Sequence, residues 1–567
     1  MSREIREYIQ NRHKSLLRRR QPWDADYKEL SRFTHPRAGR FDNEEKINPN
    51  TRSTDIIDST ARFSLRTLVA GMVAGNTSPA RPWLKVGLED YDLQGFGPVK
   101  TWLAEAQKAA HNVFRRSNLY GALPIMYRDQ GLFGTGFGLA LDDPDSLMRV
   151  YPWTVGTYCL AVDHRGIVDT AYKEFPMTAL QIAKQFGKAN MSRAALQMLE
   201  KNPDERINVI VAIEPRVDRD PRKIDNLNMP WRSVWMESAA DGDKILRESG
   251  FREWPGIAPR WEVNELDAYG SGPGIDTLAD NKHLQFNQKM KALNVDLMGN
   301  PPRSAPTSLR NQPVGGMPGD ITYFDAGAGG QKIEPTIQPN PQAIREIRED
   351  VAEIQERIRK GFYVDTFLML ATRDRGEAPT AREVDELHLE KMIELGPVVE
   401  RVYTDMQLPL TKLTFSKMIA QSKPIWDGLR DGKPLLPPPP TELKDAELRF
   451  EFIGLMSQAQ KSTGMLGIER VFGFAGQHIN LTGDNSILDG LDGDAALQEY
   501  AEMAGPPPRI VRSPKQIASM RASREQQTQA QNALAAAEVA SKAAKNVGGI
   551  KTDENNLASQ IINGGRK

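Results

Sequence analysis

The stretch 341–360 constrains the fold more than any other part of the chain, because its apolar residues recur at a spacing that suits one face of a long helix. These residues are Ile344, Ile347, Val351, Ile354 and Ile358. Intervals of three and four positions, held over two heptads, predict a helix with one narrow apolar seam. Most of the other positions are charged. A helix charged over most of its circumference suits packing against copies of itself in a ring.

The segment in front of this helix separates it from another one. Residues 275–298 are helical in pattern and end at Asn300-Pro301-Pro302. Residues 300–340 then hold seven prolines and six glycines, with short apolar runs such as 321–324. A stretch of this length inside a large protein is functional or forms an independent small β module. The sequence therefore predicts two long helices joined by such a module.

The N-terminal part predicts helices and strands together. From Arg3 to Arg40 there are eleven Lys/Arg against five Asp/Glu, and apolar residues at helical spacing indicate a basic amphipathic helix. The ordinary interpretation is a solvated helix that packs one stripe on a neighbour. A helix over 56–74 should bury Ala61, Leu65, Leu68 and Met72.

Further along the chain, residues 98–140 look helical and close on a run of glycines. Residues 157–162, 167–172 and 208–213 read as strands. The first 260 residues therefore predict a mixed α+β domain.

Residues that start or interrupt helices recur along the C-terminal half of the sequence. A third helix should run from Thr380 to about Met406, because Thr380 and Glu383 form a capping box. The prolines at 437–440 mark a rigid boundary, although they could also serve docking. From about residue 509 the chain is polar and rich in Ala and Gln, and 518–545 should be helical in part.

Composition excludes several classes of protein. The 567 residues allow roughly three to five domains, and 74 Lys+Arg balance 74 Asp+Glu, which argues against coating nucleic acid by bulk charge. The single cysteine, Cys159, excludes a disulfide framework and fits a reducing compartment. The N-terminus lacks the apolar core of a secretory signal, and no apolar run reaches the roughly 18 residues of a membrane span. We expect a soluble protein made in a cytosol, with no membrane contact.

Catalytic motifs are missing from the sequence. There is no GxxxxGK[ST], HExxH or GxSxG, and the seven histidines lie far apart. The glycines of 131–138 could cradle a phosphate, but a tight turn between helix and strand is the ordinary interpretation. Acidic clusters lie at Asp142, Asp143 and Asp145, and at Asp484, Asp489, Asp492 and Asp494. A metal site at the second cluster is the less favoured interpretation, because helix caps and turns use the same residues. We therefore expect no enzyme, no catalytic residue, no metal and no cofactor.

Eleven strings in order carry a resemblance to a known family. They are WDADYKELSRFTHPRAGRF (23–41), DSTARFSLRTLVAGMVAGNTSPARPW (58–83), SNLY (117–120), FGTG (133–136), FPMT (175–178), YGSGPG (269–274), PTAREV (379–384), LGPV (395–398), AQK (459–461), residues 489–494 and RSP (512–514). Over nearly its whole length the chain resembles the portal proteins, or head-to-tail connectors, of short-tailed, T7-like bacteriophages.

The resemblance implies an α+β portal fold that assembles into a cyclic ring, with twelve subunits expected. It divides the chain into an α/β wing at 1–268, a first stem helix at 269–299, a small β-containing clip at 300–340, a second stem helix at 341–371, a tunnel loop at 372–380, a kinked helix and wing return at 381–440, a helical crown at 441–505 and a polar Ala/Gln-rich tail at 506–567. The implied role is a conduit for double-stranded DNA packaging and ejection at one capsid vertex of the virion, assembled in the host cytoplasm. The implied partners are the packaging ATPase (the terminase large subunit), tail adaptor proteins, and capsid and scaffold proteins.

A ring around duplex DNA needs weak, sequence-independent phosphate contacts. The candidates for the channel face are Lys282, Lys289, Lys291 and Arg345, and those near the constricting loop are Lys360, Arg373 and Arg375. Each could instead form an ion pair with an acidic residue of a neighbouring subunit. The candidates for such pairs are Glu349, Asp350, Glu353 and Glu377. Two other functions stay open: a tail or baseplate scaffold, and a virion-associated hydrolase built on an acidic cluster such as 142–145.

Overall fold

The computed structural model describes residues 2–42, 54–90, 93–94, 96–223, 225–239, 244–299, 303–304, 334–335, 341–372, 395–443, 446–483, 490–504 and 514–548. The chain divides into two units. The first comprises Met1–Glu89 and Thr101–Thr463, and the second comprises Asp90–Lys100 and Gly464–Lys567.

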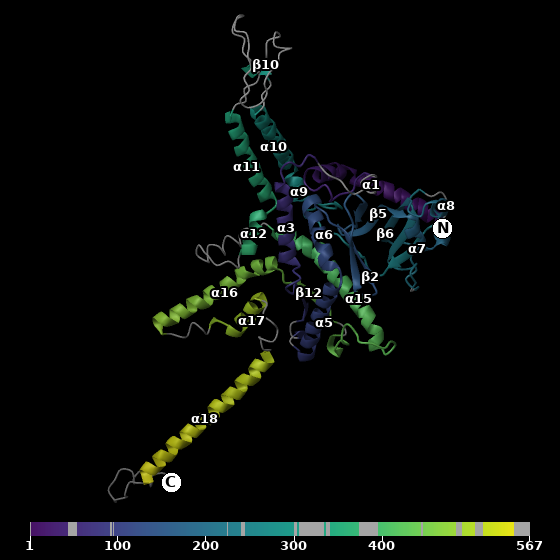
Figure 1. Ribbon diagram of the computed structural model, residues 1–567. Helices are drawn as coiled ribbons and strands as arrows, with labels where there is room; N and C mark the ends of the chain where they lie inside the picture. Colours follow the sequence, from purple (N-terminus) through teal and green to yellow (C-terminus); the bar gives the residue numbers. More distant parts are fainter. Residues whose placement is uncertain are drawn as a thin grey trace, which may run out of the picture. The chain divides into compact units, whose positions relative to one another are not determined.

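An antiparallel five-stranded sheet forms the centre of the first unit (Figure 1). Its strands, in spatial order, are β4 (Tyr158–Val162), β5 (Val168–Thr178), β6 (Arg206–Pro215), β7 (Trp231–Glu237) and β8 (Arg247–Phe251). Six consecutive residues of β6, from Val209 to Glu214, are buried. A strand buried on both sides requires a cover on each face of the sheet.

Helices supply that cover from opposite faces. α1 (Ser2–Phe33) places Ile9 and Leu16 in one core cluster with Ile210. The adjacent residue Val209 belongs to a second cluster with Ile182 of α7 (Ala179–Phe186). Successive strand residues point to opposite faces, so these clusters lie on the two sides of the sheet. A 3₁₀ turn (Lys188–Asn190) and α8 (Arg193–Lys201) follow α7.

Two of the smaller sheets of this unit lie outside the hairpin described below. The three-stranded sheet has the order β3 (Leu147–Pro152), β2 (Gly138–Asp143) and β9 (Gly256–Ile257). In the second, β1 (Leu84–Leu88) pairs antiparallel with β12 (Leu448–Phe452), with Leu84 opposite Phe452. This pair joins two parts of the chain that are far apart in sequence.

Three helices precede β2 along the chain after α1. They are α3 (Thr60–Asn76), α5 (Gly97–Arg116) and α6 (Leu119–Phe133). α6 ends at Gly134, which has φ +77°. A Cβ at this position would lie 2.1 Å from the carbonyl oxygen of Gly270. The glycine is therefore needed for its left-handed conformation and for this close approach. The run 131–138 is thus the tight turn between helix and strand.

A helical hairpin follows the sheets. The short α9 (Pro273–Asp276) leads into α10 (Leu278–Gly299), and α11 (Pro341–Gly361) returns beside it (Figure 1). Between them β10 (Arg303–Ser304) pairs antiparallel with β11 (Glu334–Pro335). α12 (Val364–Thr372) continues beyond α11.

The remaining helices of the first unit form one long run with an internal π turn. α14 (Gly396–Val402) passes into a π-helical segment (Tyr403–Gln407), and α15 (Leu408–Trp426) continues from it. A 3₁₀ turn (Thr441–Leu443) then leads to β12.

The boundary between the units falls within α16 (Leu455–Thr482). The second unit also holds α17 (Gly493–Ala504) and α18 (Pro514–Gly548). Arg521 of α18 donates two hydrogen bonds to the carboxylate of Asp494, at 2.5 and 2.8 Å. Of the described helices, none has the length and the apolar content of a bilayer span.

Most expected elements are confirmed, among them the basic N-terminal helix, the buried face of α3, the three strands, the two long helices and the helix in 518–545. The α+β class is also confirmed. Three details were wrong. The expected helix over 98–140 is two helices and the start of β2. The expected helix over 341–371 is divided at Phe362 and Tyr363. The helix expected to end near Met406 continues to Trp426, and its expected start lies outside the described residues.

Candidate functional site

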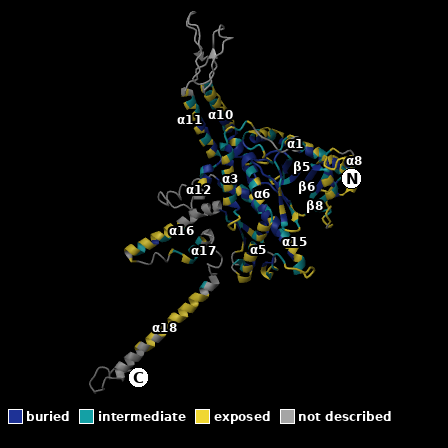
Figure 2. Ribbon diagram, viewed as in Figure 1, coloured by how far each residue is buried: buried dark blue, intermediate teal, exposed yellow. Residues whose placement is uncertain are grey.

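The hairpin of α10 and α11 is held together by a seam and by polar contacts beside it. Ile354 and Ile358 of α11 and Leu284 of α10 are fully buried. Asp350 accepts a hydrogen bond from Nδ2 of Asn287. Of the apolar seam predicted for α11, Val351, Ile354 and Ile358 are buried within the subunit, and Ile344 and Ile347 are half-buried. In the colouring of Figure 2, α11 accordingly carries buried and half-buried positions as well as exposed ones.

Further polar contacts fasten the two helices. Nε2 of His283 lies 3.8 Å from Oδ2 of Asp350, and Nη2 of Arg357 lies 3.2 Å from Oδ1 of Asp280. Asp280, His283 and Asn287 lie on one face of α10, at intervals of three and four residues. This face is therefore committed to α11 and is not free for a partner.

Four residues at the lower end of the hairpin, Asp58, Gln285, Gln288 and Gln355, form a polar group that we call the hairpin base. Oδ2 of Asp58 accepts hydrogen bonds from Nε2 of Gln288 on α10 and from Nε2 of Gln355 on α11, both at 2.8 Å. Oδ1 accepts from the backbone N–H and the hydroxyl of Thr60, at 2.8 and 2.6 Å. One carboxylate thus connects α10, α11 and the first turn of α3.

Electrostatics favour the ionised form of this carboxylate. Burial by itself raises the pKa of Asp58, but the hydrogen bonds from Thr60, Gln355 and Gln288 outweigh it and hold the pKa below the usual value. Gln285 adds a second link, since its Oε1 accepts from the backbone N–H groups of Ile57 and Asp58 at 2.8 Å. Asp58 is therefore ionised at neutral pH, and both of its carboxylate oxygens accept hydrogen bonds.

α10 is also anchored to the end of α1. Nδ2 of Asn281 donates to the carbonyl oxygen of Phe33 and to Oγ1 of Thr34, both at 3.0 Å. Nζ of Lys282 lies 2.9 Å from Oε2 of Glu29 and 5.9 Å from the ring centroid of Phe33. The hairpin is thus joined to the helix that covers the main sheet.

The break after α11 has a local cause. Tyr363 has φ +55°, a conformation that L-residues other than glycine rarely adopt. Its ring packs against Trp261, with the centroids 5.9 Å apart. A Cβ on the preceding Gly361 would lie 2.4 Å from Cγ2 of Thr277. Close packing on both sides therefore redirects the chain here.

Two surfaces of the hairpin are uncovered within the subunit. On α10, Phe286 and Leu293 are 57% and 50% exposed, and Met290 and Leu297 between and beyond them are half-buried. The spacing 286, 290, 293 and 297 makes one apolar stripe. On α11, the free face has a basic edge and an acidic edge. The basic edge consists of Arg345, Arg348 and Arg359, and the acidic edge consists of Glu349, Glu353 and Glu356.

The predicted site residues fall into three groups. Lys289 and Arg345 are exposed and Lys291 is half-buried, all on the hairpin. Several others are paired within the subunit: Lys282 with Glu29, Asp350 with Asn287, Glu353 with Arg357 at 3.5 Å, and Lys360 with Glu356 at 3.6 Å. Glu349 is exposed on the acidic edge. Arg373, Arg375 and Glu377 lie outside the described residues.

Sequence reasoning did not identify the hairpin base. Asp58 and Gln285 are 227 positions apart, so no local pattern connects them. The sequence signal that could have drawn attention to Asp58 is its position as the first residue of the string 58–83, one of the eleven strings that carry the resemblance to portal proteins.

The acidic clusters do not assemble a site in the described residues. Asp142 is paired with Nζ of Lys417, and Asp143 accepts from Ser146 in the turn after β2. Asp492 caps α17 through the backbone N–H of Asp494, at 3.0 Å. Asp484 and Asp489 lie outside the described residues. Within the residues that the structure describes, no group of three or more His, Cys, Asp or Glu side chains could hold a metal ion.

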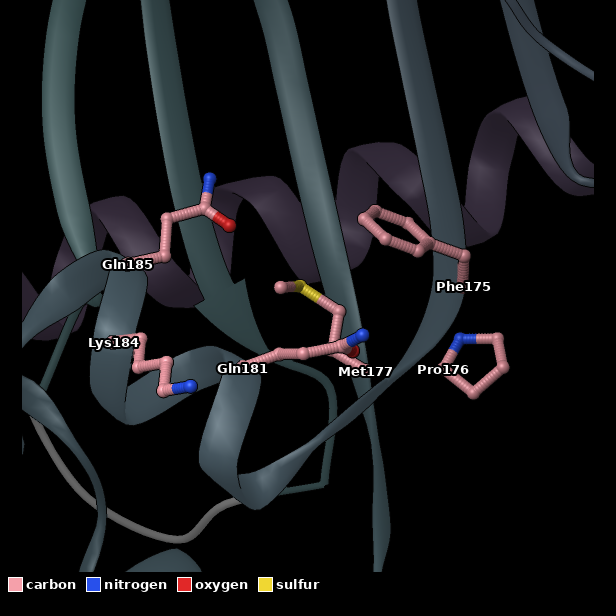
Figure 3. Close-up of a pocket in the computed structure, with 6 residues that line it drawn as sticks. All are labelled: Phe175, Pro176, Met177, Gln181, Lys184 and Gln185. Atoms are coloured by element: carbon pink, nitrogen blue, oxygen red, sulfur yellow. The ribbon is translucent and has the colours of Figure 1, made fainter. Parts of the chain in front are cut away.

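A pocket of about 610 Å³ lies where β5 passes into α7 (Figure 3). Phe175, Pro176 and Met177 of the strand line it together with three residues of the helix, which are Gln181, Lys184 and Gln185. Lys184 is the only ionisable residue among them. The pocket therefore lacks the acid–base pair that hydrolysis needs.

Comparison with known proteins gives a consistent result. A family model described as "Bacteriophage head to tail connecting protein" matches residues 6–511. The chain is 38% identical over 550 residues to the "Portal protein" of Salmonella phage epsilon15, covering 97% of this chain and 96% of that protein. It is 35% identical over 557 residues to the "Probable portal protein" of Bordetella phage BPP-1, covering 98% of each.

Proposed function

Because the chain belongs to the family of bacteriophage head-to-tail connecting proteins, we propose that it forms a ring of twelve copies around a channel for double-stranded DNA. The observation that carries this is a similarity that spans residues 6–511 and nearly the full length of both portal relatives. The chain serves as a phage portal for DNA packaging. Its place is one capsid vertex of the virion, and it assembles in the host cytoplasm.

Features of the hairpin support the closed ring. An apolar stripe on α10 and a charged face on α11 are both uncovered in one subunit. A cyclic ring brings one side of each subunit against the opposite side of the next, so two different uncovered surfaces can cover each other. In this proposal the hairpin is the stem of the ring, with α10 and α11 as the two stem helices.

The other segments follow the same assignment. Residues 1–268 form the wing, 300–340 the clip, 372–380 the tunnel loop, 381–440 the kinked helix and wing return, 441–505 the crown and 506–567 the tail. The pairing of β12 with β1 joins the start of the crown segment to the wing. The clip docks the packaging ATPase during filling and tail adaptor proteins afterwards, while capsid and scaffold proteins contact the ring at assembly.

Contacts with DNA in this proposal are weak and independent of sequence. Lys289 and Arg345 are the stem candidates with exposed side chains, and Arg373 and Arg375 are the candidates of the tunnel loop. Lys282, Lys291 and Lys360 are less available, since each is paired or half-buried in the subunit. Twelve copies of each exposed cation multiply its effect on the channel.

Native mass spectrometry with particle imaging of the same sample tests the proposal. Twelve copies of 63.4 kDa give a closed particle of about 760 kDa with a central hole. The protein hydrolyses nothing, so ATP should leave its mass and phosphate release unchanged. A chain that stays monomeric with scaffold and shell proteins present would refute the ring. A ring that never joins a capsid shell would favour a tail or baseplate scaffold instead.

A further inference from the structure

Three arginines lie near enough to His35 for their charges to act on its imidazole. Arg62 and Arg66 lie one turn apart on α3, Arg128 lies on α6, and His35 follows α1. α3 packs on α6, since Leu65 and Leu68 of α3 lie against Gly131. We call these four residues the arginine cluster.

Among the residues that the structure describes, the arginine cluster has few negatively charged partners. Arg62 has no hydrogen bond or ion pair in the part of the chain that the structure describes, and its Nε is buried without a partner. Nδ1 of His35 is likewise buried without a partner. Arg128 lies 2.6 Å from Oδ1 of Asp129, the one carboxylate that the structure pairs with the cluster.

The lowered pKa of His35 indicates that the surrounding charge is positive. Burial, as the largest cause, and the charges of Arg128, Arg62 and Arg66 together lower the pKa of His35 to about 4. His35 is therefore neutral at pH 7. The unpaired Nε–H of Arg62, next to the other guanidinium groups, is a hydrogen-bond donor that an anion from outside the subunit can satisfy.

The surface next to the cluster is apolar as well as charged. Phe63, between the two arginines of α3, is 59% exposed, and the guanidinium carbon of Arg66 lies 5.7 Å from its ring centroid. Ile57 is 50% exposed at the hairpin base. Exposed aromatic side chains beside arginine are typical of protein interfaces rather than of a solvated DNA channel.

We propose that the arginine cluster binds carboxylates on α11 of the adjacent copy in the ring, with Glu356 as the principal ligand. This inference rests on the proposed function, because it needs the ring. The partner is a second copy of this chain, whose acidic edge is the complement of the cluster in charge.

The direction of the helices supports the choice of Glu356. α3 runs beside α11 and α12 in the same sense, since Gln355 bonds Asp58 near one end and Phe367 packs against Gly71 near the other. Rotation about the ring axis keeps every residue at its own height along that axis. We compare the two residues along the shared direction of α3 and α11, at a rise of roughly 1.5 Å per residue. Arg62 then lies about 6 Å past the level of Asp58, and Glu356 lies about 1.5 Å past the level of Gln355. Long side chains bridge the difference.

Glu356 is also available for this role. Its one recorded partner is Lys360 on the same helix, at 3.6 Å, and the two side chains are 48% and 69% exposed. An exposed pair of this kind contributes little to stability and exchanges readily for a better partner.

Charge reversal in the full-length chain tests the inference. The variants are Arg62→Glu, Glu356→Arg and their combination, each assembled under the conditions that give wild-type rings. We expect each single variant to lower the fraction of closed rings at least tenfold in native mass spectra, and the combination to restore most of it. Arg62→Gln, which removes the charge and keeps a long polar side chain, should have an intermediate effect. Thermal melting of the unassembled subunit checks that each variant is folded.

Two control variants carry the same charge changes elsewhere. The controls are Glu200→Arg and Arg193→Glu, both at exposed positions of α8 and away from the hairpin. Both should assemble like the wild type. A loss of rings in these controls equal to that of the cluster variants would overturn the inference, and so would failure of the combination to restore assembly.

The test separates this inference from the proposed function. If the wild type forms no ring, the proposed function fails. If the wild type and Arg62→Glu both form rings, the function stands and the carboxylate site is refuted. If Arg62→Glu rings also bind duplex DNA more weakly than wild-type rings, the cluster is a phosphate site instead.

Discussion

Replacing Asp58 with alanine removes the acceptor that connects the three helices of the hairpin base. The carboxylate receives four hydrogen bonds, from two groups of Thr60 and from the amides of Gln288 and Gln355. A hydrogen bond to a charged acceptor contributes about 1.5–3 kcal/mol. Because the site is half-buried and the glutamines can turn to water, we expect a local loss of about 2–4 kcal/mol.

Hydrogen exchange followed by mass spectrometry measures this loss where it occurs. A loss of 2–4 kcal/mol corresponds to roughly 30- to 900-fold faster exchange in peptides from the start of α3 and the lower half of α10. Asp58→Asn should cost less, since it keeps one oxygen for Thr60 and the glutamine amides can rotate to offer their oxygens. Asp145→Ala, in an exposed turn, is the control and should change neither peptide.

The pH dependence of hydrogen exchange at the hairpin base gives a second test of the role of Asp58. The pKa of Asp58 is lowered in the fold, so its contribution is present above the usual carboxyl pKa and is lost as pH falls through the lower, folded value. Asp58→Ala should lack this acid-dependent change at the hairpin base. A less than threefold change in exchange, or an equal change in the control, would refute the role that we assign to Asp58.

Three other predictions address the fold. Arg260→Ala should lower the free energy of unfolding by about 3–5 kcal/mol, measured by denaturant titration, because it leaves the carboxylate of Asp405 without its buried partner at 2.9 Å; an effect below 1 kcal/mol would contradict this. Gly134→Ala should sharply reduce soluble yield, since its φ is +77°, whereas Gly121→Ala, with open space around it, should not. His35→Gln should remove a loss of stability that the wild type shows in thermal melts as pH falls from about 6.5 towards 4. That window follows because burial and the nearby arginine charges lower the pKa of the folded histidine to about 4, and the unfolded chain takes up the proton first; identical pH profiles would refute it.

The parts of the fold that sequence predicts are those with local periodicity. The seam of α11 and the buried face of α3 follow from intervals of three and four residues, and Ile354 and Leu68 are fully buried as those intervals require. The break at Phe362 and Tyr363 was missed although Gly361 ends α11, because a single glycine does not fix a helix end and the packing of Tyr363 against Trp261 is a tertiary contact.

The continuation of the helix past Met406 has a similar explanation. Pro409 lacks an N–H, and its ring normally clashes with the carbonyl four residues earlier, at Asp405. The π turn at Tyr403–Gln407 widens the helix at that carbonyl, so the proline fits inside a continuous run.

Less of the candidate site than of the fold could be predicted from the sequence. The hairpin and its charged residues were predicted, but the partners of Lys282 and Asp350 come from helices whose relative placement depends on tertiary packing. The hairpin base and the arginine cluster each join segments that lie far apart along the chain, so neither leaves a short motif.

The pairing of β1 with β12 has a consequence for the timing of synthesis. Leu88 lies opposite Leu448, 360 positions later, and Phe452 stacks on Trp83 with the centroids 5.9 Å apart. At about 5–20 residues per second, a ribosome needs roughly 20–70 s to cover that interval. During this time the edge of β1 lacks its partner strand. A nascent chain therefore cannot complete this part of its core on the ribosome until most of its length has emerged, which favours assembly from finished subunits over recruitment of partial ones.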